Sequence, residues 1–188
     1  MRELEKIYKL NNVKRWNGVF SLQQQSVSEH CFYCACISGM LVDIYNEVED
    51  KHLDTEKVIL RALYHDISES FLSHLTHEAK NTSEMLKEEV ERQKNKGYIE
   101  WCRSINRPDL CCDKNIGDIE NILEFSDTFD AWMYAYMELE YGNQALRSAY
   151  ERLTVALQKQ KETYRWAKIF CERYLKEEKY KPIVCSIK

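Results

Sequence analysis

The sequence predicts an all-α protein, and two observations carry that prediction. Only five Gly and two Pro occur in 188 residues, so long helices have few places where they must break. Apolar residues recur at helical spacing in several segments, as in residues 54–70 and 118–141. A chain of this length fits one domain, residues 1–188, which can bury a substantial core.

The N-terminal half is expected to form three helices separated by polar breaks. Asn11-Asn12 interrupts the first, amphipathic helix. A serine in Ser26-Val27-Ser28-Glu29 can cap the second, and Asp54 or Thr55 can cap the third. We expect these helices over residues 2–10, 26–46 and 54–70.

The C-terminal half is expected to be helical apart from two loops. Residues 71–82 mix polar breaks with histidines, and residues 106–117 form the clearest loop, a candidate lid or interface element. Gly142-Asn143 ends the longest apolar helix. We expect helices over residues 83–96, 98–104, 118–141 and 144–178.

Composition argues against nucleic-acid and membrane partners. The net charge is −4 with interspersed signs, so the chain has no basic stripe for a duplex. The first residues lack the apolar segment of a signal peptide, and no apolar run reaches the roughly 18 residues needed to span a bilayer. We therefore expect a cytoplasmic protein with reduced thiols.

Cysteines crowd together at Cys31, Cys34 and Cys36, which invites a zinc interpretation. They lie in a predicted helix, and no second cysteine pair follows at zinc-finger spacing. Free cysteine is a common small buried residue. We therefore interpret these cysteines as core residues.

The strongest functional signal is the pair His65-Asp66, with a further histidine, His30, and a further aspartate, Asp127. Two imidazoles and two carboxylates form a ligand set for a divalent ion, for which Mn, Co, Zn, Fe, Ni and Mg are the candidates. Because adjacent helical residues diverge by about 100°, the other ligands must come from other helices. Taken singly, His30 can be a capping or core imidazole, and Asp127 can pair with an arginine. Within an apolar pattern, however, a buried carboxylate needs a partner, and a cation is suitable.

The order and spacing of four segments resemble the HD-domain phosphohydrolases, most closely the YfbR-like 5′-deoxynucleotidase branch. The resemblance spans about residues 10–145. It implies an HD-domain helical bundle in which His30, His65, Asp66 and Asp127 bind one divalent ion between helices. The segments that carry it are Lys14-Arg15-Trp16, Ser26-Val27-Ser28-Glu29-His30, His65-Asp66-Ile67-Ser68-Glu69 and Ser126-Asp127.

The resemblance also implies roles for Glu69, Arg15 and Trp16. Glu69 occupies the position of the catalytic carboxylate, and its spacing from Asp66 lets it orient a water molecule or handle its proton. Arg15 and Trp16 match the pair that contacts the phosphate and shapes the nucleotide site. Arg15 can clamp phosphate oxygens, and Trp16 can stack on sugar or base. From composition alone, they would be interpreted as a surface arginine and a core tryptophan.

The chain departs from the branch at His74, where an aspartate near the sugar is expected, and His77 follows closely. Both histidines are candidate substrate-binding residues, and the alternative is a pair of solvated loop residues. Extra phosphate contacts would fit phage relatives of this branch that remove triphosphate from deoxynucleoside triphosphates.

We therefore expect a metal-dependent phosphohydrolase of deoxynucleotides that removes the 5′-phosphate of deoxynucleoside monophosphates with a metal-activated water. A deoxynucleoside triphosphate triphosphohydrolase is the alternative. A non-catalytic, metal-stabilised helical binding module is the third hypothesis, against which the presence of Glu69 argues. The expected partners are a small nucleotide substrate and, from the resemblance, further copies of the chain in a homodimer or larger homo-oligomer.

Overall fold

The computed structural model describes residues 2–72 and 82–176, which form helices and one isolated β-bridge between Lys14 and Ser26. Within these ranges the all-α prediction is confirmed. The α-helices are α1 (Arg2–Lys9), α2 (Val27–Glu49), α3 (Thr55–Tyr64), α4 (Glu69–Leu72), α6 (Glu84–Ser104), α7 (Ile116–Glu140), α8 (Arg147–Thr163) and α9 (Arg165–Tyr174). Short 3₁₀ turns cover Leu10–Asn12, Pro108–Leu110 and Gln144–Leu146.

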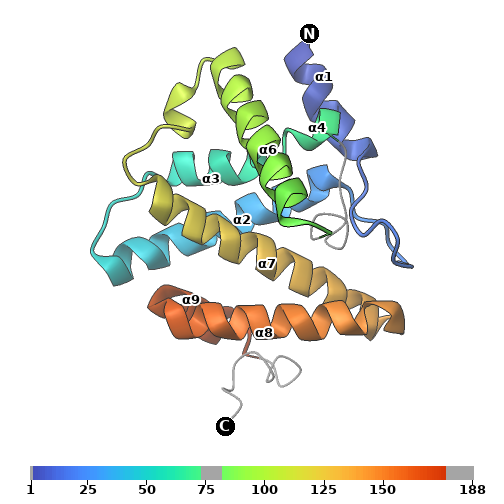
Figure 1. Ribbon diagram of the computed structural model, residues 1–188. Helices are drawn as coiled ribbons and strands as arrows, with labels where there is room; N and C mark the ends of the chain where they lie inside the picture. The colour runs from blue at the N-terminus through green and yellow to red at the C-terminus, as the bar shows by residue number, and fades with distance from the viewer. Residues whose placement is uncertain (1, 73–81, 177–188) are drawn as a thin grey trace.

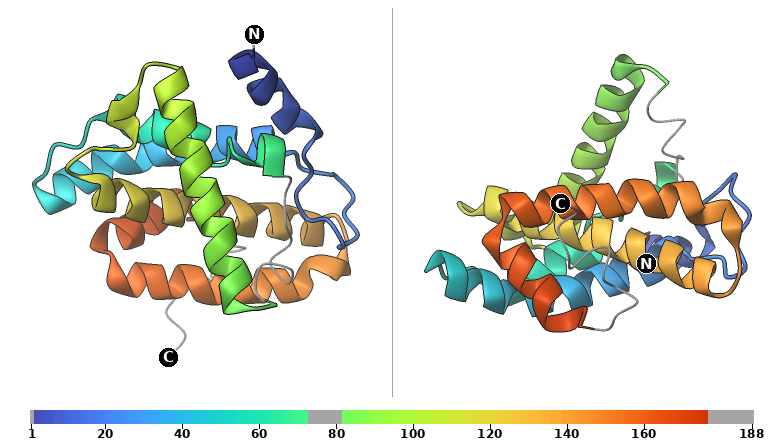
Figure 2. Two further views of the ribbon diagram at one scale, coloured as in Figure 1. Left: turned by 45° about the horizontal axis from the view of Figure 1, so that its top comes forward. Right: turned by 90° about the horizontal axis from the view of Figure 1, so that it is seen from below.

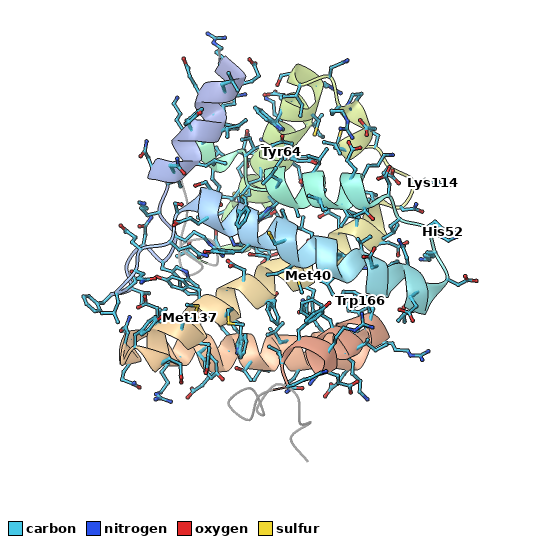
Figure 3. The ribbon with its side chains drawn as sticks, turned by 180° about the vertical axis from the view of Figure 1, so that it is seen from behind. Met40, His52, Tyr64, Lys114, Met137 and Trp166 are labelled. Atoms are coloured by element: carbon cyan, nitrogen blue, oxygen red, sulfur yellow. The ribbon has the colours of Figure 1, made fainter. Side chains whose placement is uncertain are left out.

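Helices α2 and α7 form the centre of the bundle. α3 packs on α2, α8 and α9 cover one side of the central pair, and α6 crosses on the other side (Figures 1 and 2). A core rich in aromatic residues fills the space between α2, α7, α8 and α9. Its centre is Trp166, labelled in Figure 3, whose ring lies 5.6 Å from Phe125 and 5.8 Å from Tyr45.

The predicted caps are confirmed at the starts of α2 and α3. Ser26 and Glu29 form a reciprocal capping box, in which each side chain accepts a hydrogen bond from the backbone N–H of the other residue. The Asp54 side chain accepts from Glu56 N and Lys57 N. Gly142, with φ 91°, follows the end of α7, where the left-handed backbone favours glycine.

The helix containing His65 and Asp66 was predicted to reach residue 70, but α3 ends at Tyr64. The chain continues through hydrogen bonds between residues three apart, from Ile67 N to Tyr64 O at 3.0 Å and from Glu69 N to Asp66 O at 2.9 Å. Three residues per turn place Asp66 and Glu69 one above the other.

Two helices were predicted over residues 83–96 and 98–104, but α6 runs unbroken from Glu84 to Ser104. Gly97, which lies between the two predicted helices, is buried where α6 is approached so closely that a side chain would not fit. A Cβ atom at Gly97 would lie 2.5 Å from the ring of Phe71 and 3.1 Å from Ser68 Cβ. The glycine therefore lets α4 and the turn before it approach α6 closely.

One helix was predicted over residues 144–178, but α8 and α9 are separate. Tyr164 lies between them in an extended conformation, with φ −120° and ψ 116°. Its ring stacks on Trp166 at 4.9 Å, and its hydroxyl donates to Asn121 Oδ1 at 3.2 Å. These contacts redirect the chain so that α9 packs against α2.

From the sequence, no apolar segment was expected to be long enough to span a bilayer. By length and composition alone, however, helix α2 could cross a membrane. Half of its most apolar window is buried in the bundle. The same helix carries buried His30 and the buried core residues Leu41, Val42 and Ile44. Its apolar composition is thus accounted for by its central position, and a cytoplasmic location stays a prediction.

Candidate active site

The four side chains predicted to bind a metal come together from three parts of the chain. His30 lies in the first turns of α2, His65 and Asp66 follow α3, and Asp127 lies in the middle of α7. His30 Nε2 lies 3.1 Å from Asp127 Oδ1 and 4.0 Å from Asp66 Oδ2. His65 Nε2 lies 3.5 Å from Asp66 Oδ2. Nitrogen and oxygen donors thus face one another within a few ångströms.

His65 is held so that one ring nitrogen faces this cluster. Its Nδ1 lies 2.7 Å from the carbonyl oxygen of Ala62 and donates to it. Its Nε2 is buried and has no hydrogen-bond partner within residues 2–72 and 82–176. Burial lowers the pKa of His65 despite the neighbouring Asp66 carboxylate, which favours the neutral ring. A buried nitrogen lone pair without a donor fits a metal ligand.

His30 is oriented by a residue that sequence reasoning missed. Its Nδ1 lies 2.6 Å from Oδ2 of Asp130, so Nε2 is left to face Asp127 and Asp66. Asp130 is buried and also accepts from Gln25 Nε2 at 3.0 Å. Asp130 follows Asp127 by three residues, and this i,i+3 spacing was the available signal.

Cys34 is a second unexpected neighbour of the cluster. Its Sγ lies 3.5 Å from His30 Nδ1, and it can offer a ligand atom within 4.8 Å of those of His30, His65 and Asp127. Only the thiolate is a good ligand, however, and burial raises the pKa of the Cys34 thiol. The interpretation as core residues is confirmed for Cys31 and Cys34, which are buried, but it is wrong for Cys36, which is exposed. The three crowded cysteines therefore do not form a joint site.

Arg15 reaches into the site from the loop before α2. Its Nη1 donates to Asp130 Oδ2 at 3.0 Å and contacts His30 Nδ1, and its Nη2 lies 3.5 Å from Asp127 Oδ1. The Arg15 side chain is only 11% exposed, which excludes the surface interpretation. The guanidinium therefore balances the carboxylates of Asp130 and of the predicted ligand Asp127.

Trp16 follows Arg15 in the sequence, but its side chain contacts Tyr134 and Gln25 and not the predicted metal ligands. Its backbone has φ 60°, and its half-buried ring stacks on Tyr134 at 5.2 Å. The indole Nε1 donates to Gln25 Oε1 at 3.3 Å. Trp16 is thus neither a core residue nor a lining residue of the pocket described below.

The loop that carries Arg15 and Trp16 is tied to α7 by Glu138, another residue that the sequence did not indicate. The buried Glu138 carboxylate accepts from Leu22 N at 2.7 Å, from Gln23 N at 2.8 Å and from Asn143 Nδ2 at 2.6 Å. Burial alone would raise the pKa of Glu138, but these hydrogen bonds lower it below its ordinary value.

Glu69, the predicted catalytic carboxylate, begins α4 and is buried. Its Oε1 lies 2.7 Å from Lys94 Nζ, and the same ammonium lies 2.8 Å from Asp66 Oδ1. Burial opposes the charge of Asp66, but His65 and Lys94 favour it more strongly, so the pKa of Asp66 is well below its ordinary value. Lys94, on α6, was not predicted.

A pocket of about 440 Å³ opens over these residues. Its lining includes Arg15, Lys94 and the predicted ligands His65, Asp66 and Asp127. The same lining also includes Glu91, Glu120, Glu124, Tyr98 and Arg61. Arg61 pairs with Glu120 at 2.6 Å and lies 3.8 Å from the centre of the Tyr98 ring, so its charge is already balanced.

The sequence model of the family described as 5′-deoxynucleotidase YfbR-like matches residues 4–178. The chain belongs to this family. A 4′-phosphooxetanocin A phosphatase from Priestia megaterium is 30% identical over 179 residues, 93% of this chain and 92% of the relative. The 5′-deoxynucleotidase YfbR of Salmonella arizonae is 27% identical over 165 residues, 82% of each chain.

Solved structures show the same fold. An HD-domain phosphohydrolase from Listeria innocua matches with a TM-score of 0.74 at 23% identity, over 96% of this chain and 91% of that one. A cyanophage S-2L HD phosphohydrolase, solved with dA and one catalytic Zn²⁺ ion, matches with a TM-score of 0.58 at 13% identity. The match covers 89% of this chain and 95% of that one. The predicted HD-type fold and the resemblance to the YfbR-like branch are confirmed.

Family membership also confirms the prediction of a metal-dependent phosphohydrolase. The roles of individual residues in this YfbR-like chain stay predictions. His74 and His77 lie outside the described residues. Their predicted contacts with substrate therefore stay predictions as well.

Proposed function

We propose that this chain removes the 5′-phosphate of deoxynucleoside monophosphates with one divalent ion bound by His30, His65, Asp66 and Asp127. The match to the 5′-deoxynucleotidase family supports the reaction class. When bound, such an ion would lower the pKa of water and polarise a phosphoryl oxygen. The remaining chemistry depends on side chains of the pocket.

The donor chemistry supports this ligand set. Two imidazoles and two carboxylates suit Zn, Co, Fe, Ni or Mn, and Mg is the hardest candidate. The buried Nε2 of His65 and the Nε2 of His30 are both turned toward the carboxylates by hydrogen bonds at the opposite ring nitrogens. Asp66 is preferred over Cys34 as the fourth ligand because its pKa is low, whereas that of Cys34 is raised.

Glu69 is the proposed group that orients the attacking water and accepts its proton. It follows Asp66 by one tight turn, and its Oε1 is fixed by Lys94. Arg15 lines the same pocket and is proposed to bind the phosphate through forked, charge-assisted hydrogen bonds. Its charge would stabilise the negative charge that develops on the phosphoryl oxygens.

Three glutamates in the pocket lining are the observation that favours monophosphates over triphosphates. They are Glu91, Glu120 and Glu124, and the charge of Arg61 is already paired with Glu120. Two further phosphates would add negative charge next to these carboxylates, which is unfavourable. A neutral sugar and base suit this acidic lining better, because they bring no negative charge close to the glutamates.

Product analysis tests the proposal. Purified protein is incubated with deoxynucleoside monophosphates, ribonucleoside monophosphates and deoxynucleoside triphosphates in Mn²⁺, Co²⁺, Zn²⁺ or Mg²⁺. We expect free phosphate from the deoxynucleoside monophosphates. Release of triphosphate would instead support the triphosphohydrolase alternative, and no product with any nucleotide would support the non-catalytic module.

Paired histidine variants serve as controls. His30→Ala should abolish activity, whereas His52→Ala should retain it, because His52 is exposed in the loop between α2 and α3 (labelled in Figure 3). Oligomeric state is a separate question, and the predicted homodimer or larger assembly is to be tested by light scattering.

A further inference from the structure

Lys94, on α6, contacts two carboxylates of the candidate active site. Its side chain is 16% exposed, although lysine is among the residues least often buried. Its ammonium lies 2.8 Å from Asp66 Oδ1 and 2.7 Å from Glu69 Oε1. Burial opposes its charge, but the two carboxylates outweigh this and raise the pKa of Lys94. Lys94 thus forms an ion pair with each of the two carboxylates.

The two carboxylates that Lys94 joins have different proposed roles. Asp66 Oδ1 faces Lys94, whereas Asp66 Oδ2 faces His65 Nε2 at 3.5 Å and His30 Nε2 at 4.0 Å. The contact with Lys94 therefore fixes which oxygen of Asp66 is directed at the ligand cluster. The same ammonium also restrains Glu69, the proposed water-orienting group.

Helix packing holds the ammonium in place. Gly97 lies about one turn after Lys94 on α6, where it allows Ser68 and Phe71 to approach the helix. This close approach brings the turn that carries Asp66 and Glu69 against α6. The position of Lys94 relative to both carboxylates is thus set by backbone packing and not by a flexible surface contact.

We propose that Lys94 is a positioning residue, which holds Asp66 in its metal-binding orientation and Glu69 in its water-orienting orientation. The inference rests on the proposed function for the identity of these two roles. It predicts that loss of Lys94 weakens metal binding through Asp66 and slows turnover through Glu69. Substrate affinity should be little changed, because Lys94 acts through the two carboxylates.

Three variants test the inference in the full-length protein. Lys94→Met removes the charge and keeps most of the side-chain volume, and Lys94→Arg keeps the charge. Lys96→Met is the matched control, because Lys96 lies on the same helix and its side chain is 63% exposed. Metal affinity is measured by calorimetric titration of the metal-free protein with Mn²⁺ or Co²⁺, without nucleotide.

Lys94→Met should bind Mn²⁺ about 10- to 100-fold more weakly than wild type, in the range for loss of residues that orient metal ligands. At saturating metal its kcat should fall by a similar factor, with KM within about twofold. Lys94→Arg should keep metal affinity and kcat closer to the wild-type values than Lys94→Met does, because it keeps the positive charge although a guanidinium differs in shape from an ammonium. Lys96→Met should match wild type.

The double variant with Glu69→Gln distinguishes positioning from an independent contribution. If Lys94 acts on turnover through Glu69, Lys94→Met should lower kcat no further in the Glu69→Gln background. Multiplicative losses in kcat would overturn the proposal. A raised KM with unchanged kcat would also overturn it and identify Lys94 as a direct phosphate ligand.

The inference can still be tested if Lys94→Met does not fold or if the proposed function is wrong. If Lys94→Met does not fold, Lys94→Gln, which removes the charge but keeps a polar side chain, decides, and wild-type metal affinity and kcat in folded Lys94→Gln would overturn the inference. The proposed function fails separately, through absence of monophosphate hydrolysis by wild type. In that case the metal titrations still test the contact between Lys94 and Asp66.

Discussion

The Nδ1 atom of His30 lies 2.6 Å from Oδ2 of Asp130, and this contact leaves Nε2 facing Asp127. A carboxylate behind a metal-binding imidazole fixes the ring and raises its basicity. Asp130→Asn should therefore weaken metal binding by about 10- to 100-fold while the fold is retained. Calorimetric titration with Mn²⁺ measures the metal affinity, and circular dichroism shows whether the fold is retained. Unchanged metal affinity would contradict the orienting role of Asp130.

Asp66 and Glu69 should differ in what their removal affects. Asp66→Ala should lose metal and activity together, whereas Glu69→Ala should keep the metal and lose turnover. The reason is that a ligand holds the ion, while a group that handles protons acts mainly in the transition state. Metal content by mass spectrometry and kcat distinguish the two. Equal loss of metal in both variants would refute the role assigned to Glu69.

Arg15→Lys should lower kcat/KM by about 10- to 100-fold, equivalent to about 1.4 to 2.7 kcal/mol. Lysine retains the charge but cannot reproduce the planar fork of a guanidinium. The fall should appear in turnover as well as in substrate affinity, with bound metal unaffected. Steady-state kinetics and metal analysis measure this, and wild-type kinetics in Arg15→Lys would exclude Arg15 from the phosphate site.

Glu124 offers a test of the acidic lining. It is exposed and lines the pocket. Glu124→Lys should raise the ratio of triphosphate to monophosphate hydrolysis by on the order of tenfold, equivalent to about 1.4 kcal/mol. Competition between a deoxynucleoside triphosphate and the matching monophosphate measures the ratio. An unchanged ratio would show that the lining does not select for phosphate number.

Glu138 should make stability depend on pH. Its folded-state pKa is lowered, so its contribution is fully present above the ordinary value of 4.5 and is lost as pH falls through the folded pKa. Glu138→Gln should lower the free energy of unfolding by about 1 to 3 kcal/mol near neutral pH. The difference from wild type should shrink below the ordinary pKa, as measured by urea titrations.

Glu140→Gln is the matched control for this experiment, because Glu140 is exposed near the end of the same helix. It should leave stability unchanged at every pH. Glu138→Gln should also lower kcat/KM, since Glu138 anchors the loop that carries Arg15. A constant difference between wild type and Glu138→Gln from pH 7 to pH 4 would show that the Glu138 charge adds no stability.

The metal-site residues that could be predicted from the sequence are those that stand out from their neighbours along the chain. His65 and Asp66 are adjacent, and His30 and Asp127 interrupt apolar helical patterns, so each stands out in the sequence alone. Lys94 does not, because it lies in a charged helix together with Lys87 and Lys96. Only the packing of α6 against α4 distinguishes these lysines, and that packing joins segments far apart in the chain.

Helix boundaries, too, could be predicted where they depend on local sequence but not where they depend on tertiary contacts. Asp54 and Ser26 have local capping chemistry, and both caps are confirmed. Gly97 and Tyr164 depend instead on tertiary contacts. Gly97 lies between the two predicted helices but serves close packing inside the single helix α6, and Tyr164 separates α8 from α9 without any Gly or Pro to mark the position.

The contacts of Arg15 also couple the binding of metal to the binding of nucleotide. Its guanidinium is the counter-ion of Asp127 and Asp130 in this structure. A divalent ion at Asp127 would take over part of that neutralisation and release Arg15 toward an incoming phosphate. Metal and nucleotide affinities would then be thermodynamically linked, so that each ligand tightens binding of the other by the same factor.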